Sequence, residues 1–238
     1  MAPEDGVCVG DWHSGSLASK LPIDRIKPRG FHGSVKEHDW SFVRRLRYLN
    51  YDQDPTQFGV ELLDDVLDRF KGRCYLNADK FWENPERIAT AIRDHGMTEQ
   101  IVVKSRPRND ILDVTERYCA DLPFMGIVRR PEEIEILRKR KLRYVGSEVL
   151  FDSDESVFAT REFVDGQHRD GLLVWVNAIV YDHRVVLAGG HSDDRAVCGD
   201  KDGSWGWIAN RGYDLMQTDW TLSASMYLAA TGRRSCLQ

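Results

Sequence analysis

Polar side chains suited to binding phosphate or a cation stand at the ends of short apolar runs in this chain. Asp79 and Lys80 directly follow Cys74–Ala78, and Lys104 ends the run Ile101–Lys104. Ammonium groups at such places can neutralise phosphate oxygens in a ground or transition state. A carboxylate is the ligand type that hard cations such as Mg²⁺ and Ca²⁺ prefer. Solvated lysines and a capping carboxylate are the alternative interpretation, but two lysines that end neighbouring apolar strands favour a binding site.

Glu148 is a candidate substrate-binding residue within the run Tyr144–Phe151, shortly after Gly146. It can point into the mouth of a barrel, where an acidic group is costly unless it is paired. Lys80 or Lys104 would be its natural partner. A core ion pair and a site residue are both open interpretations of Glu148.

Trp175 and Asn177 share one face of the run Leu172–Ile179, because successive side chains of a strand point to opposite faces. Asn177 is nearer the carboxyl end of the strand, where it can hydrogen-bond a substrate. Trp175 is predicted to pack in the core, and it can also line the substrate pocket.

The segment from Tyr181 to Arg211 is a long connection without a strand, and long loops are often functional. It contains His191, Asp193 and Asp194, which are residue types that bind metals. A structural loop that covers the barrel mouth is the favoured interpretation, and a metal site is the alternative.

The elements that must position these residues are short apolar strands that alternate with amphipathic helices. Strands are predicted at Cys74–Ala78, Ile101–Lys104, Phe124–Val128, Tyr144–Phe151, Leu172–Ile179 and Asp214–Thr218. Helices are predicted at Leu62–Phe70, Asn84–Arg93, Asn109–Ala120 and Pro131–Arg140, after a cap at Asp154, and from Thr221 to Gly232 after a cap at Asp219. Strands that are apolar on both faces are typical of a parallel sheet covered by helices. Their serial repetition without a GxGxxG turn favours a TIM-type (β/α) barrel over a doubly wound sheet.

A complete barrel of this type has eight strands. Residues 1–58 offer at most one more strand, near Val7–Val9, and are otherwise rich in loop-forming residues. We therefore expect an atypical, loop-rich N-terminal segment over residues 1–58 and barrel units over residues 59–238, together in a single domain.

Composition excludes several classes of function. The 238 residues are 42% hydrophobic, which is enough for one sizeable core. The net charge is −5 and no basic stripe stands out, which argues against nucleic acid as a partner. Five scattered cysteines without a CxxC pair favour a reducing cytoplasm over a zinc site or a disulfide scaffold. No apolar run approaches the ~20 residues that span a bilayer, and the oligomeric state is left open.

Several segments, taken in order, resemble the glycerophosphodiester phosphodiesterase family. CYLNADK is similar to that family's lnxDK strand, and QIVVKS is similar to the strand that follows it. LVWVN resembles its vWvN strand, and GWIANRGYDLMQTDW resembles its terminal Gw…rGxdxiqTDxP segment. The resemblance covers most of residues 40–232. It implies a phospholipase-C-like phosphodiesterase barrel that hydrolyses a glycerophosphodiester to an alcohol and glycerol phosphate in lipid metabolism. It also implies a divalent metal, Mg²⁺ or Ca²⁺, with Asp79 as a ligand.

The beginning of the family pattern is missing or altered in this chain. In the family, early strands carry His-Arg-Gly and Glu-x-Asp, and an Asp-Gly turn then leads to a His-Asp pair. Its two histidines act as acid and base, and its acidic residues hold the metal. Here no His-Arg-Gly or Glu-x-Asp strand precedes Cys74. Asp11 and His13 stand near the expected His-Asp positions, which makes His13 the candidate catalytic acid.

Two hypotheses for the function remain open from the sequence. The first is a metal-dependent hydrolase that acts on a small-molecule phosphodiester. The second is a catalytically inactive or truncated relative that binds a phosphorylated ligand or a protein partner, with Lys80 and Lys104 converging without an acid–base pair. A truncated barrel would leave strand edges open to pairing.

Overall fold

The structure, a computed structural model, describes residues 8–9, 34–50, 52, 54–180 and 185–233. The chain divides into two compact units, Met1–Arg69 and Phe70–Gln238. The candidate residue His13 belongs to the first unit and lies outside the described residues. All of the other candidate site residues lie in the second unit.

The first unit contains a small sheet with the strand order β1-β2-β3. β1 (Cys8–Val9) is parallel to β2 (Arg47–Leu49), and β2 is antiparallel to β3 (Pro55–Gly59). The sequence predicts only the strand near Val7–Val9, so the expectation of a single strand here is wrong. β2 and β3 were missed because they are short and lack an apolar alternation, and most of β3 is exposed.

Three short helical segments complete the description of this part of the chain. They are a 3₁₀ turn (Val35–Glu37), α2 (Trp40–Val43) and α3 (Leu63–Phe70). The Asp39 side chain caps α2 by accepting a hydrogen bond from the backbone N–H of Phe42 at 3.0 Å.

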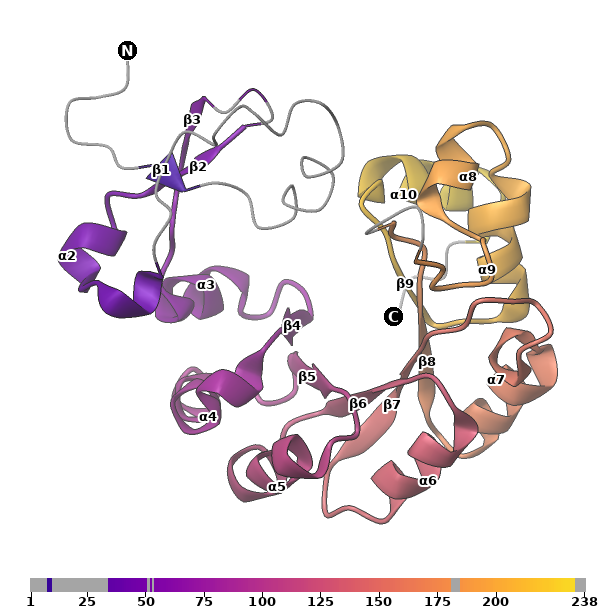
Figure 1. Ribbon diagram of the computed structural model, residues 1–238, viewed down its shortest axis with the longest axis horizontal. Helices are drawn as coiled ribbons and strands as arrows, with labels where there is room; N and C mark the ends of the chain where they lie inside the picture. The colour runs from indigo at the N-terminus through magenta and orange to yellow at the C-terminus, as the bar shows by residue number, and fades with distance from the viewer. Residues whose placement is uncertain (1–7, 10–33, 51, 53, 181–184, 234–238) are drawn as a thin grey trace. The chain divides into compact units, whose positions relative to one another are not determined.

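The second unit is built on a parallel sheet of six strands that curls into a half-barrel (Figure 1). The strands pair in chain order, and each is parallel to the next. They are β4 (Leu76–Ala78), β5 (Ile101–Ser105), β6 (Phe124–Val128), β7 (Tyr144–Val149), β8 (Leu173–Asn177) and β9 (Leu215–Gln217). The predicted parallel α/β arrangement is therefore confirmed, and the curled sheet is consistent with a TIM-like fold.

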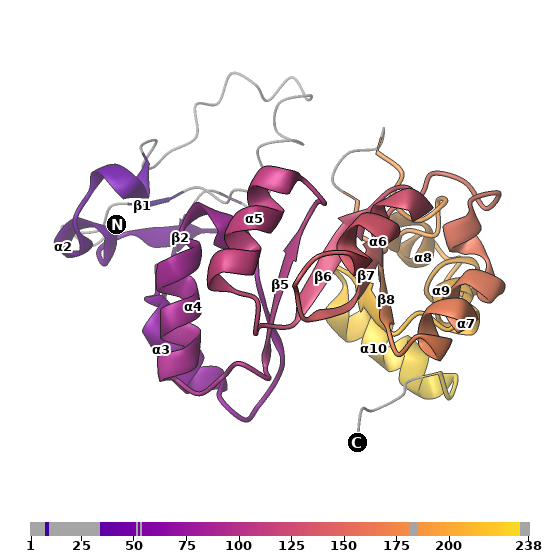
Figure 2. The same cartoon turned by 90° about the horizontal axis from the view of Figure 1, so that it is seen from below.

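Four helices cover the convex side of this sheet, as Figures 1 and 2 show. They are α4 (Pro85–Asp94), α5 (Asn109–Tyr118), α6 (Pro131–Arg138) and α7 (Arg161–Arg169). Proline stands in the first turn of both α4 and α6, where its missing N–H leaves no helical hydrogen bond unmade. No helix among the described residues is both long enough and apolar enough to cross a membrane.

Side-chain alternation divides each strand between the helical layer and the concave face. Buried apolar residues face the helices: Val103, Phe124, Val128, Val149, Val174 and Val176. The alternate positions point to the concave face: Lys104, Met125, Glu148, Trp175 and Asn177. Gly126 faces α6 and lets it approach closely, since a Cβ there would lie 2.0 Å from Cδ1 of Leu137. The buried charged and amide side chains of the sheet thus gather on the concave face.

Two predicted helix caps are wrong. α7 is capped by Thr160, whose Oγ1 accepts a hydrogen bond from the backbone N–H of Phe163 at 3.2 Å, and not by Asp154. A 3₁₀ turn, Val157–Ala159, separates Asp154 from the helix. The closing helix, α10 (Thr221–Ala230), has Trp220 and not Asp219 at its cap position.

The connection between β8 and β9 contains three helical segments among its described residues, so the prediction of one long loop is wrong. It contains α8 (Asp193–Val197), a π-helical turn (Asp202–Gly206) and α9 (Trp207–Arg211). These elements could not be predicted from the sequence, because each is about one turn long and the glycines among them are typical of turns.

Candidate functional site

A buried ion pair lies at the carboxyl end of the half-barrel, on its concave face. Nζ of Lys104 is 2.5 Å from Oε2 of Glu148, and the two side chains are only 5% and 7% exposed. The same Nζ stands 3.6 Å from the centroid of the Trp175 ring, within the range of a cation–π interaction. Lys104 precedes the last residue of β5 and Glu148 precedes the last residue of β7, so both ends of the pair sit near the barrel mouth.

Asn177 completes this cluster from the end of β8. Its Nδ2 donates a hydrogen bond to Oε1 of Glu148 at 2.5 Å, so each carboxylate oxygen of Glu148 has a partner. Of the two lysines that the sequence offers to Glu148, the structure selects Lys104. The ammonium and the carboxylate neutralise each other, and the cluster as a whole carries no net charge.

Two polar atoms of this cluster remain unsatisfied within the described part of the chain. Nε1 of Trp175, a donor, and Oδ1 of Asn177, an acceptor, are buried and have no hydrogen-bond partner. The amide of Asn177 cannot simply be reversed, because that would place its oxygen against the carboxylate of Glu148. Buried polar groups are nearly always hydrogen-bonded in native proteins, so such atoms point to a missing water or ligand.

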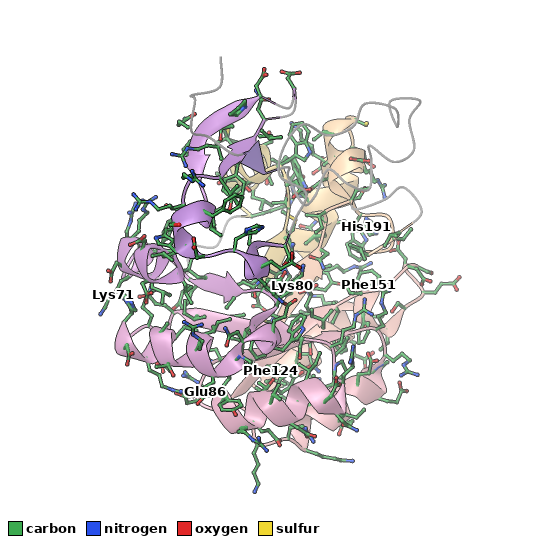
Figure 3. The ribbon with its side chains drawn as sticks, turned by 60° about the vertical axis from the view of Figure 1, so that its left-hand side comes forward. Lys71, Lys80, Glu86, Phe124, Phe151 and His191 are labelled. Atoms are coloured by element: carbon green, nitrogen blue, oxygen red, sulfur yellow. The ribbon has the colours of Figure 1, made fainter. Side chains whose placement is uncertain are left out.

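Asp79 and Lys80 follow β4 and are exposed. Lys80 has φ 52° and ψ 25°, the left-handed conformation, and it is the one non-glycine residue with a positive φ among the described residues. Figure 3 shows Lys80 at the same end of the sheet as Phe151, which follows β7, and away from Phe124, which begins β6. Strained backbone of this kind is concentrated at functional sites.

The structure therefore brings together four of the predicted residues: Lys104, Glu148, Trp175 and Asn177. Asp79 and Lys80 lie at the end of a strand of the same sheet, but they are not among the residues that hydrogen-bond to Glu148. Whether any of the six contacts a substrate stays a prediction.

The described residues do not by themselves fit the divalent metal that the resemblance implies. Within the ranges that the structure describes, no three His, Cys, Asp or Glu side chains gather closely enough to hold a metal ion. Asp79 offers a single carboxylate, and hard cations usually take six or more oxygen ligands.

Asp193 organises the segment after β8. Its buried carboxylate accepts hydrogen bonds from Nε1 of Trp205 at 2.8 Å, Oγ1 of Thr218 at 2.7 Å and the backbone N–H of Asp219 at 2.9 Å. These contacts join α8, the π-helical turn and the end of β9. The sequence offers Asp193 as a loop residue or a metal ligand, and the structure gives it this bracing role.

His191 is likewise tied into the structure. Its Nδ1 is 2.5 Å from the carbonyl oxygen of Gly203, and its Nε2 is 2.8 Å from Oδ1 of Asp154. The imidazole stacks on Trp207 with ring centroids 3.6 Å apart. Figure 3 shows His191 near Phe151, at the carboxyl end of the sheet. His191 thus connects the segment after β7 to the π-helical turn.

A cavity of about 210 Å³ opens beside Asn177. Its lining is mixed, with apolar residues such as Ile179 and Leu187 and polar residues such as Ser192 and Asp194. Sequence reasoning missed this feature. The signal for it was a pair of apolar runs, Ile179–Val180 and Val185–Leu187, that flank four polar or aromatic residues in the sequence.

The fold is similar to that of glycerophosphodiester phosphodiesterases of known structure. A glycerophosphoryl diester phosphodiesterase from Parabacteroides distasonis matches with a TM-score of 0.64 and 16% sequence identity, over 84% of this chain and 66% of that one. A Galdieria sulphuraria protein assigned to the glycerophosphodiester phosphodiesterases matches with a TM-score of 0.59 and 14% identity, over 83% and 73%. A second P. distasonis glycerophosphodiester phosphodiesterase gives 0.51 and 13%, over 90% and 76%. At such identities the likeness establishes the fold alone.

Comparison at the level of sequence adds little. The model of one family, described as a domain of unknown function (DUF4996), matches residues 124–228, which is less than half of the chain. No curated protein matches the sequence. The chain spans 66% of the length of the first structure named above.

Proposed function

We propose that this protein is a phosphodiester hydrolase that acts on a small molecule of the glycerophosphodiester kind. The observation that carries the proposal is the buried cluster of Lys104, Glu148, Trp175 and Asn177, with its unsatisfied donor and acceptor. It lies at the carboxyl ends of parallel strands, where (β/α) barrel enzymes hold their active sites. The similarity of the half-barrel to structures of glycerophosphodiester phosphodiesterases supports the same assignment.

The cluster is better explained by a site than by stability. Apolar residues of similar volume often stabilise a protein as well as a buried ion pair does, because removing two charges from water is costly. A fold that needed only a core at Lys104 and Glu148 could therefore use apolar side chains there. A polar cluster at the barrel mouth supports a role in binding.

Each group has a definite part in binding a phosphodiester. In this proposal the indole N–H of Trp175 donates to a phosphoryl oxygen and the amide oxygen of Asn177 accepts from a hydroxyl or amine of the substrate, once the side chains that bury both atoms have moved. Lys80, at the end of β4, is our candidate for a cationic contact to the phosphate. The ion pair fixes the positions of Trp175 and Asn177 before the substrate binds.

Hydrolysis also needs a group that protonates the leaving alkoxide. His13 is our candidate for this role, on the resemblance alone. Asp79 is our candidate ligand for Mg²⁺ or Ca²⁺, which would polarise the phosphoryl group when bound. Neither assignment rests on the buried cluster.

The test is alcohol release from a glycerophosphodiester and from an aryl phosphodiester, each with Mg²⁺, Ca²⁺ or EDTA. We expect metal-dependent turnover that is abolished in His13→Ala and Asp79→Ala. Lys80→Met should lower kcat/KM by about a hundredfold, the lower end of the effect of removing one group that stabilises developing charge. Lys71→Met is the matched control, because Lys71 is also an exposed lysine and lies at the outer side of the unit in Figure 3.

Two results would overturn the proposal. One is the absence of turnover from folded protein with every metal. The other is an equal loss of activity in Lys80→Met and Lys71→Met, which would mean that the lysine at the end of β4 has no special role.

A further inference from the structure

The segment from Trp40 to Leu49 has a buried side and an exposed side in the first unit, where it forms α2 and β2 (Figure 1). Its buried apolar residues recur at every third position: Val43, Leu46 and Leu49. The residues between them are the half-buried Arg47 and the exposed Arg44, Arg45 and Tyr48. The burial of every third residue therefore turns two arginines and a tyrosine outward.

The arginines of this segment are not neutralised by carboxylates. Among the residues that the structure describes, no ion pair involves Arg44, Arg45 or Arg47. The guanidinium carbon of Arg45 lies 5.7 Å from the centroid of the Phe42 ring. The carboxylate of Asp39 accepts a hydrogen bond from the backbone N–H of Phe42 at the start of α2. Three positive charges within four positions therefore make this surface locally positive, although the whole chain carries −5.

Three exposed aromatic side chains accompany these charges. Trp40 is 39% exposed, Tyr48 is 46% exposed and Phe58 is 62% exposed. Trp40 lies one turn before Arg44, whose backbone N–H donates a hydrogen bond to the carbonyl oxygen of Trp40 at 2.9 Å. Residues four apart in a helical turn are neighbours on its surface, so Trp40 and Arg44 share one side of α2.

β2 and β3 bring Tyr48 and Phe58 to one face, beside the end of α2. Arg47 pairs with Gly59, and Tyr48 and Phe58 are the next residues inward from this pair, so both aromatic side chains lie on the opposite face to it. Nη1 of Arg47 donates a hydrogen bond to the carbonyl oxygen of Arg44 at 3.2 Å. A Cβ on Gly59 would lie 2.8 Å from the same Nη1. The end of α2 therefore adjoins the end of β3, next to Phe58.

We propose that Trp40, Arg44, Arg45, Tyr48 and Phe58, the arginine–aromatic face, bind the surface of a bilayer that contains anionic lipids. Tryptophan and tyrosine rings are favoured at the level of lipid headgroups, because each has an apolar body and a polar tip. Arginine presents a fork of donors that matches the phosphates of those headgroups. The inference goes beyond the proposed function, because it uses neither the half-barrel nor its buried cluster.

Nucleic acid also presents phosphates, but it fits the arginine–aromatic face less well. Binding to nucleic acid is dominated by phosphate contacts along a basic patch or stripe. Here two exposed arginines stand in a chain of net charge −5. Three exposed aromatic side chains beside two arginines favour a surface that takes up apolar area as well as positive charge, which a lipid interface does.

The experiment measures flotation of the full chain with vesicles. The vesicles contain phosphatidylcholine alone, or phosphatidylcholine with one part in three of phosphatidylserine. We expect the protein to float with the vesicles that contain phosphatidylserine and not with the others, because the anionic surface attracts the arginines. Salt at about 1 M, where the screening length is about 3 Å, should release most of the protein. This comparison uses the native protein, so it does not depend on the folding of a variant.

The double variant Arg44→Gln with Arg45→Gln tests the charge. Each arginine near an anionic surface contributes about 1 kcal/mol, so the loss of two should weaken binding about thirtyfold. The matched control is Arg87→Gln with Arg117→Gln, which removes two exposed positive charges from α4 and α5. The control should bind as the native protein does, and circular dichroism checks that both variants are folded.

Phe58→Ser tests the aromatic contribution. It should weaken binding about tenfold, because an aromatic ring no longer leaves water on binding. Tyr75→Ser is the matched control, since Tyr75 is a 71% exposed aromatic residue that precedes β4 in the second unit. It should leave binding unchanged.

Three results would overturn the inference. One is equal flotation with both kinds of vesicle, or flotation with neither. The second is a variant of the arginine–aromatic face that floats just as its matched control does. The third is binding of a single-stranded oligonucleotide, lost in the arginine double variant, by a protein that binds no vesicles, which would assign the face to nucleic acid. Because no turnover is measured, failure of this inference leaves the proposed function standing.

Discussion

Nζ of Lys104, near the end of β5, lies 2.5 Å from Oε2 of Glu148, near the end of β7, so the pair reaches across the intervening strand β6. Both side chains are almost fully buried. A pair in this setting gains strong attraction but loses the hydration of two charges. Replacing both residues and replacing only one of them should therefore have very different effects on the free energy of unfolding.

Replacing one residue of the pair should lower the free energy of unfolding more than replacing both residues. Glu148→Gln leaves the ammonium of Lys104 buried without its counter-charge, and we expect the free energy of unfolding to fall by about 3 kcal/mol. The double variant Lys104→Met with Glu148→Leu should lie within about 1 kcal/mol of the native protein. Urea unfolding followed by circular dichroism measures both.

The same double variant tests whether the pair serves the site. If it folds normally and turnover on a phosphodiester falls, the pair acts in binding or positioning the substrate. Native turnover from a stable double variant would show that Lys104 and Glu148 belong to the core only.

Lys80→Gly should increase stability and decrease activity. Lys80 occupies the left-handed region, where a side chain costs about 1 kcal/mol and glycine does not. We expect the free energy of unfolding to rise by about 0.5 kcal/mol, since glycine also gains entropy in the unfolded chain. Lys80→Ala should lose activity to the same degree without the gain in stability. Equal stability of the two variants would argue against backbone strain at this position.

The sequence was sufficient for the strands that are apolar on both faces. Phe124–Val128 is predicted to the residue because every position in it is apolar or glycine and the neighbouring helices are amphipathic. The same reasoning could not find β2 and β3, because strands of three and five residues with few apolar side chains leave no apolar pattern. Helices of one turn, such as α8 and α9, fail for a similar reason, since one turn is too short to show a period.

The candidate site was predictable in its residue types and not in its pairings. Position at the ends of parallel strands singled out Lys104, Glu148 and Asn177, because such ends meet at one edge of the sheet. The choice of Lys104 over Lys80 as partner of Glu148 depends on the strand register and on how far each side chain reaches. The pairing of His191 with Asp154 was not predictable either, because the two residues are far apart in the sequence and meet only when the segment after β8 folds back.

Gly146→Ala should be strongly destabilising, although the substitution is small. A Cβ at Gly146 would lie 2.1 Å from the carbonyl oxygen of Leu173, which is backbone of the adjacent strand β8 and cannot rotate away. We expect a loss of about 3 kcal/mol, at the upper end of overpacking effects, together with reduced activity because β7 and β8 carry Glu148 and Asn177.

The matched control for this strand substitution is Gly166→Ala in α7, where the nearest atom to a new Cβ is Nη2 of Arg169 at 3.6 Å. Alanine is favoured over glycine inside a helix, so this variant should gain about 0.5–1 kcal/mol. Thermal unfolding of the two variants measures the contrast. A similar stability for both would show that β7 and β8 separate easily to admit a methyl group.

Asp121 should stabilise the protein at neutral pH and lose this effect in acid. Arg93 holds its carboxylate by two hydrogen bonds, from Nη2 at 2.5 Å and Nε at 2.9 Å. These hydrogen bonds lower the pKa of Asp121 below its ordinary value of 3.8. A carboxyl group with a lowered folded-state pKa contributes stability above the ordinary pKa, and the contribution disappears as the pH falls through the folded-state value. Because both side chains are partly exposed, we expect less than about 1 kcal/mol.

The measurement is the difference in unfolding free energy between native protein and Asp121→Asn, taken from urea titrations at neutral pH and again at an acid pH below the folded-state pKa of Asp121. The variant should be less stable at neutral pH, and the difference should shrink toward zero in acid, where the native carboxyl is protonated as well. Asp94→Asn, at an exposed position in α4 next to Arg93, controls for the general loss of one negative charge. A difference for Asp121→Asn that is the same at both pH values would show that the ion pair with Arg93 contributes nothing to stability.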